Sequence, residues 1–153
     1  MSLVYGTDAS LGQALFGHAQ LGDRRRTARL VKTFNQMQRH PGGTLPDKLS
    51  TPADLRGFYR LCDEDDVTHA AIVDAARQHT LRRIGESDQP VLIVQDSTEL
   101  DYTDLKSLCD DLGQIGKGNK RGYICHNVLA MGAETGEVLG LVDQILHRRD
   151  EVP

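Results

Sequence analysis

The sequence predicts an α+β fold in which a helical first part precedes an antiparallel β-sheet. Up to residue 85, apolar side chains recur at helical spacing, and after residue 90 they fall in short strand-like runs. The polar segment at residues 85–90, Gly-Glu-Ser-Asp-Gln-Pro, separates the two patterns and is typical of a linker. We therefore expect a helical domain at residues 1–85 and a strand-rich domain at residues 90–153.

The first long helix is predicted over Arg24–Arg39. Asp23 provides a capping carboxylate in front of it, and His40-Pro41-Gly42-Gly43 ends it. Leu30, Phe34 and Met37 recur at helical spacing and give it one apolar face. A separate face is basic and consists of Arg25, Arg29, Lys32 and Arg39.

Two further helices are predicted after a loop at residues 40–50. The first begins at Thr51-Pro52, because a hydroxyl can cap a helix and proline is favoured at its first position. Its expected core-facing residues are Leu55, Phe58, Tyr59 and Leu61. The second runs from Thr68 to about residue 83, with Ala71, Ile72, Ala75, Ala76 and His79 on its inner side. Between them lies an acidic run at residues 63–66, which we interpret as solvated loop and helix-start acids.

The second part is predicted to be a β-meander. Residues 91–95 form a short apolar run typical of a buried strand, so Asp96 is expected where that strand leaves the core. Residues 123–131 and 138–146 flank a Thr-Gly turn and predict an antiparallel hairpin. His126 lies in the first of these strands, where a histidine is more often a packed residue than a catalyst.

Between the first strand and the hairpin, a short helix is expected near residues 104–111. It is followed by a glycine-rich run at residues 113–122. This run is not a phosphate-binding P-loop, since no Ser or Thr follows Gly116-Lys117. A basic loop beside a nucleic-acid groove and a plain surface loop both stay open as interpretations.

Charge and composition narrow the class of function. The chain has a net charge of −4, yet residues 1–60 carry nine lysines and arginines against four acids, and residues 61–153 carry nine against eighteen. This asymmetry indicates that the N-terminal part faces a polyanion. No apolar stretch reaches the roughly 20 residues that cross a bilayer, and the N-terminus lacks a secretory signal. Three cysteines without paired spacing predict reduced thiols in a cytoplasmic protein.

Three arginines, residues 24–26, lie in the first turn of the helix that Asp23 is expected to cap. There they oppose the helix dipole, at a cost of roughly 0.3–1 kcal/mol per charge at low salt. Phosphate groups at this helix end would remove the conflict, because free N–H groups and arginines both favour anions. A solvated basic face is the alternative, but it does not explain why the arginines lie at the unfavourable end.

Asp96 allows two interpretations. It can be a ligand for the metal ions of phosphodiester chemistry, or a turn residue whose side chain caps the amides of Ser97 and Thr98. Two other classes of function also stay open. One is a small α/β enzyme centred on Asp96, Lys117, Arg121 and His126. The other is an interaction module without nucleic acid that uses residues 63–66 and the open edge of the sheet.

Taken in order, four segments resemble the N-terminal portion of bacterial cut-and-paste DDE transposases of the transposon-five type: LGDRRRTARL, LRGFYRLCDEDDVT, VQDST and RGYICHNVL. The resemblance covers roughly Ala14 to Leu146. It implies a small helical domain that recognises the transposon-end DNA. It also implies a following RNase H-like domain, whose Asp-Asp-Glu triad binds two Mg²⁺ or Mn²⁺ ions, cleaves DNA at the element's ends and joins those ends to a target.

Residue roles follow from the matching positions. The resemblance implies that Arg25, Arg26 and Arg29 contact transposon-end DNA, with help from Arg39 and His40, and that Asp96 is the first acid of the triad.

The remaining acids of the triad have no match here, since neither Asp101 nor Asp143 occupies their positions, which fall beyond Pro153. We therefore expect a helical domain that binds double-stranded DNA, followed by a truncated RNase H-like meander that holds no stable metal ion and does not cleave DNA. The edge of such an incomplete sheet favours self-association.

Overall fold

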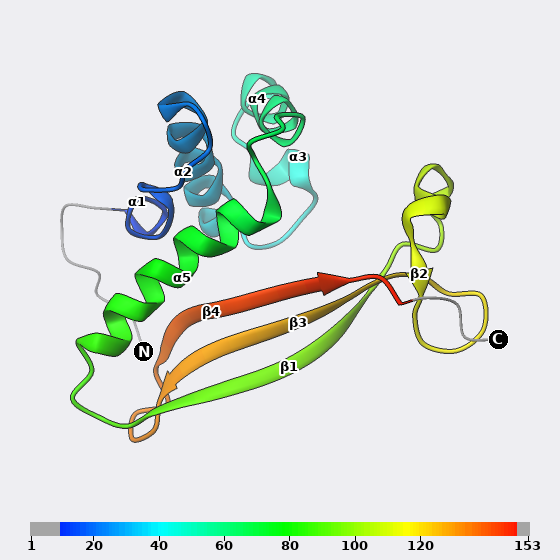
Figure 1. Ribbon diagram of the computed structural model, residues 1–153. Helices are drawn as coiled ribbons and strands as arrows, with labels where there is room; N and C mark the ends of the chain where they lie inside the picture. The colour runs from blue at the N-terminus through cyan, green and yellow to red at the C-terminus, as the bar shows by residue number, and fades with distance from the viewer. Residues whose placement is uncertain (1–9, 150–153) are drawn as a thin grey trace. The chain divides into compact units, whose positions relative to one another are not determined.

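The computed structural model describes residues 10–149, except for the side chain of Cys109 (Figure 1). These residues form two compact units, divided between His79 and Thr80, inside helix α5 (His69–Gly85). Helices precede a four-stranded antiparallel sheet, so the predicted α+β class is confirmed. The predicted domain limits, 1–85 and 90–153, stay predictions.

The first unit is helical. Helix α2 (Arg24–Arg39) has the limits that the sequence predicts, and Asp23 caps it. Helix α4 begins at Pro52 with Thr51 as its cap, which confirms the second predicted helix. The 40–50 segment contains a short helix in place of a plain loop, because Thr44 and Asp47 form a capping box there. The elements are α1 (Leu11–Phe16), α2, α3 (Leu45–Lys48), α4 (Pro52–Cys62) and the first part of α5.

Apolar side chains from several of these helices form the core of the first unit. The rings of Phe16 and Phe34 meet edge to face with centroids 5.1 Å apart, which joins α1 to α2. Leu21, just before α2, and Leu61, in the last turn of α4, are also buried. The expectation that Tyr59 faces the core is wrong, since 52% of it is exposed on the outer side of α4.

The second unit is built on a long central strand. Strand β3 (Arg121–Gly132) pairs along its length with β1 (Val91–Asp101) on one side. On its other side it pairs with β4 (Val138–His147) and, near its start, with the two-residue β2 (Gly113–Gln114). A 3₁₀ helix at Lys106–Asp111 occupies the place of the predicted short helix. The predicted hairpin and meander are confirmed, with β2 as an addition.

Strand β1 differs from its prediction in length and in burial. It continues to Asp101, so Asp96 lies inside the strand, opposite Asn127. Leu92 and Ile93 are 53% and 51% exposed, so the expectation of a buried strand is wrong. An apolar run is typical of a strand covered on both faces, whereas β1 is an edge strand whose one strand neighbour among the described residues is β3.

Two expectations from composition can be compared with the described residues. No helix within residues 10–149 is long and apolar enough to cross a membrane. Cys62 and Cys125 are free thiols, as predicted. The side chain of Cys109 and the N-terminal residues in which no secretory signal is expected lie outside the described part.

Candidate nucleic-acid interface

The segment Leu21-Gly22-Asp23 sets the start of helix α2. Leu21 is fully buried and anchors the chain. Gly22 has a φ of 74°, a backbone conformation that side chains disfavour. The Asp23 carboxylate accepts a hydrogen bond of 2.7 Å from the Arg25 backbone N–H and caps the helix. The basic residues that follow are thereby held at one end of α2.

Arg25 projects into solvent. Its guanidinium lies 2.8 Å from Asp23, yet 92% of its side chain is exposed. The hydrogen bonds from the side chain and backbone of Arg25 lower the pKa of Asp23 to about 2. Arg25 thus keeps most of its surface open to a ligand while Asp23 stays ionised above that pH.

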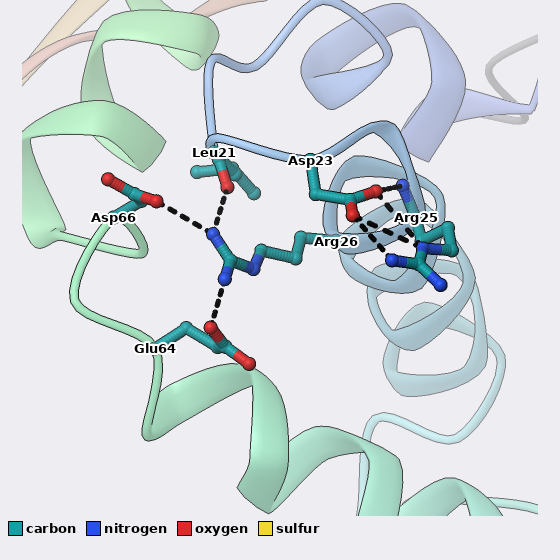
Figure 2. A network of polar contacts seen from close by, with 6 residues as sticks. All are labelled: Leu21, Asp23, Arg25, Arg26, Glu64 and Asp66. Atoms are coloured by element: carbon teal, nitrogen blue, oxygen red, sulfur yellow. Dashed lines mark hydrogen bonds and ion pairs between the residues drawn. The ribbon is translucent and has the colours of Figure 1, made fainter.

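Arg26 is held inside the unit (Figure 2). Its Nη1 donates to the Leu21 carbonyl at 3.0 Å and to Asp66 at 2.7 Å, and its Nη2 donates to Glu64. The side chains of Glu64 and Asp66 are 41% and 61% exposed, as expected for solvated acids, and both also form ion pairs with Arg26. Glu64 and Asp66 lie 38 and 40 residues after Arg26 in the sequence, so these contacts join the acidic run to the start of α2.

A buried carboxylate on α4 holds the middle of α2. Asp54 is 5% exposed and accepts from Arg29 at 3.0 Å and from Lys32 at 2.5 Å. Hydrogen bonds from Lys32, and then from Gln36, hold the pKa of Asp54 well below its ordinary range. Gly57 allows the Arg29 guanidinium to lie against α4, since a Cβ there would come within 2.8 Å of the Arg29 Cζ.

Carboxylates near the start of α2 offset the unfavourable interaction between its arginines and the helix dipole. Asp23, Glu64 and Asp66 already place negative charge near the first turn of α2. The position of the arginines therefore does not by itself require phosphate. Which of these arginines can bind a ligand therefore depends on how much of each side chain is exposed.

A groove of about 500 Å³ runs between α2 and α4. Four arginines face two carboxylates along it, so its lining is net positive. Such a concave basic surface on helices suits the backbone of a nucleic acid. Its lining residues are Asp23, Arg25, Arg26, Arg29, Gly57, Arg60, Leu61 and Glu64.

Sequence reasoning missed the contribution of α4 to this groove. Arg60 lines it, and Arg56 lies one turn earlier on the same helix. Both are exposed, and neither has an ion-pair partner among residues 10–149. Their spacing of four residues in LRGFYRLC was the signal that could have revealed a basic face on α4.

Arg39 and His40 lie at the other end of α2. Both are exposed, and His40 is the C-cap of the helix. Fourteen residues separate Arg25 from Arg39, which corresponds to about 21 Å along an α-helix. The structure therefore does not bring Arg39 and His40 into the groove, although they can extend a basic surface along α2.

Asp96 is exposed on β1, in a shallow pocket of about 580 Å³. The pocket also contains Ser97 and His126, whose side chains are hydrogen-bonded to each other, and the His126 ring stacks on His147 with centroids 5.1 Å apart. Within residues 10–149 no three His, Cys, Asp or Glu side chains gather in a way that could hold a metal ion. The residues described here do not fit a two-metal site.

The four residues of the alternative α/β enzyme do not form one site. Asp96 lies opposite Asn127, six residues along β3 from Arg121, which corresponds to about 20 Å. Neither Arg121 nor Lys117 lines the pocket that contains Asp96 and His126. The geometry therefore gives this alternative no support.

The first unit is a helical module with a net positive groove between two of its helices, α2 and α4. Comparison with known families gives the particular type. Residues 8–67 match the family model described as "Transposase DNA-binding". The matched segment includes α2, α4, the groove and the acidic run. The chain thus carries a transposase DNA-binding domain at these residues, which implies binding of transposon DNA.

The lowered pKa of Asp54 predicts how the stability of this unit depends on pH. Because the folded-state pKa lies below the unfolded value of about 3.9, the Asp54 contacts stabilise the fold above about pH 4 and are lost as the pH falls further. At pH 7, Asp54→Asn should unfold at a lower temperature than wild type. At pH 3 the difference between the two unfolding midpoints should be smaller. Circular dichroism measures both.

The matched control is Asp65→Asn, which removes the same charge from an exposed side chain without an ion-pair partner within residues 10–149. It should leave the midpoint nearly unchanged. Equal effects of the two substitutions at pH 7 would contradict the structural role of Asp54.

Proposed function

We propose that this protein binds double-stranded transposon-end DNA through the groove between α2 and α4. The observation that carries the proposal is the set of four arginines, from two helices, along one groove of the segment that matches the transposase DNA-binding family. Arginine is suited to this role because its planar guanidinium binds phosphate and guanine through paired hydrogen bonds.

The arginines have different roles in this proposal. Arg60, and Arg25 with 92% of its side chain exposed beside Asp23, contact the DNA directly. Arg26 and Arg29 present less exposed guanidiniums that carboxylates hold in place. Arg39 and His40 extend the contact along α2. The about 21 Å between Arg25 and Arg39 spans about six base pairs at 3.4 Å each.

The test is a pair of substitutions, Arg25→Ala and Arg60→Ala, measured by fluorescence anisotropy with a duplex of the transposon end. Each should weaken binding and make the slope of log K against log salt shallower by about 0.9, because one phosphate contact is lost. A residue that reads a base should also cost about 1–3 kcal/mol of preference at one position.

Arg82→Ala is the control, since Arg82 is an exposed cation of the second unit. It should leave both the affinity and the slope close to wild type. Equal losses for all three variants would show that the chain responds to overall charge, and the groove would not be the DNA site.

We further propose that the second unit is the start of an RNase H-like domain, with Asp96 as the first acid of its triad. The antiparallel order of β1, β3 and β4 and the exposed position of Asp96 support this assignment. In the complete family, Mg²⁺ or Mn²⁺ supplies a Lewis acid and activates the attacking hydroxyl. Asp96 alone provides one carboxylate towards such a site.

This chain should therefore not cleave DNA by itself. Purified protein incubated with Mg²⁺ and supercoiled plasmid carrying the transposon end should leave the plasmid intact on a gel, for wild type and Asp96→Ala alike. Nicking by wild type that Asp96→Ala abolishes would contradict this expectation.

Strand β1 supports a second proposal, that copies of this chain associate through the sheet edge. Leu92, Ile93 and Val94 are 53%, 51% and 41% exposed on a strand with one strand neighbour in the described part of the chain. Long apolar edge strands of this kind pair readily with other strands.

Sedimentation velocity at rising concentration should show dimers or larger species. Ile93→Lys should suppress them, because a charged side chain on an edge strand opposes pairing. Leu81→Lys, which changes an equally exposed residue on helix α5, should not. A strictly monomeric wild type would refute this proposal.

A further inference from the structure

The acidic run beside the groove occupies an arginine that phosphate would otherwise bind. The Arg26 guanidinium donates to three internal acceptors, namely the Leu21 carbonyl, Asp66 and Glu64 (Figure 2). A guanidinium has five N–H donors, and its paired binding of phosphate needs two parallel ones. With both terminal nitrogens engaged, Arg26 cannot offer its Nη pair to a phosphate while these contacts persist.

The two carboxylates remain within reach of solvent. Their side chains are 41% exposed for Glu64 and 61% exposed for Asp66, against 27% for Arg26. Glu64 also lines the groove itself. A DNA backbone that enters the groove therefore meets negative charge close to an arginine that is already neutralised.

The contact is built into the fold at this end of α2. A Cβ on Gly22 would overlap the Asp66 carboxylate and come within 2.8 Å of the Arg26 Nη1. The buried Leu21 places its carbonyl as a further acceptor for the same nitrogen. Backbone and side chains together thus hold the guanidinium between Glu64 and Asp66.

We propose that Glu64 and Asp66 act as internal substitutes for phosphate, which restrain the binding of duplex DNA of arbitrary sequence. This inference rests on the proposed DNA-binding function of the groove. Electrostatic contacts to phosphate supply most of non-specific binding, so withholding one arginine lowers that binding for every sequence. Arg26 is then a positioning residue until the carboxylates release it.

The test compares two double variants of equal charge on a duplex of random sequence. Glu64→Gln/Asp66→Asn frees Arg26, whereas Asp63→Asn/Asp65→Asn removes two acids of the same run that have no ion pair to Arg26. The first should gain roughly tenfold more affinity than the second, as expected for one added hydrogen bond to a charged group. Its salt slope should steepen by about 0.9.

Arg26→Gln shows whether a gain in affinity comes from the release of this arginine or from the change in overall charge. In the Glu64→Gln/Asp66→Asn background, Arg26→Gln should remove the added affinity and the added slope, whereas in wild type it should cost less. Equal gains for the two double variants, or equal losses on Arg26→Gln in the two backgrounds, would overturn the inference.

Thermal unfolding by circular dichroism shows whether each variant is folded. Asp66→Asn alone, which keeps the ion pair of Arg26 with Glu64, should give an intermediate gain in affinity. If wild type binds no duplex at low salt, both the proposed function and this inference fail. If wild type binds and the gains are equal, only this inference fails.

Discussion

The pairing of α2 arginines with carboxylates is the constraint on which the rest of the first unit depends. Asp54 on α4 holds Arg29 and Lys32, and the run after α4 holds Arg26. These contacts fix α2 against α4, and the groove exists because the two helices are held in this way. The same contacts decide which positive charges remain available, since each arginine that stabilises the unit is less free to bind an anion.

The exposed and engaged cations therefore have complementary tasks. Arg25 and Arg60 line the groove without a buried partner, so their charges can attract a polyanion to it. Arg26 and Arg29 define the geometry of its wall. This division reconciles a net charge of −4 for the chain with a basic surface on one unit, because most acids lie outside the groove.

Local patterns in the sequence predicted the helices of the first unit well. Asp23 and the Thr51-Pro52 pair are short-range signals whose effect is confined to one helix end, and both proved correct. The ion pairs to Glu64 and Asp66 could not be predicted, since they join residues 38 and 40 positions apart that only tertiary packing brings together. The contribution of Arg60 was missed although its spacing of four residues from Arg56 was visible in the sequence. The second unit shows the same limit: composition identified β1, but its position at a sheet edge depends on neighbours, which an apolar run does not specify.

The central claim is that DNA contacts the groove between α2 and α4 through its open arginines. The most direct test is heteronuclear NMR of the arginine side-chain N–H groups during titration with a transposon-end duplex. The Nε signals of Arg25 and Arg60 should shift first and most, while that of Arg82 stays unchanged. Shifts confined to arginines outside the groove, with Arg25 and Arg60 unaffected at saturation, would contradict the account.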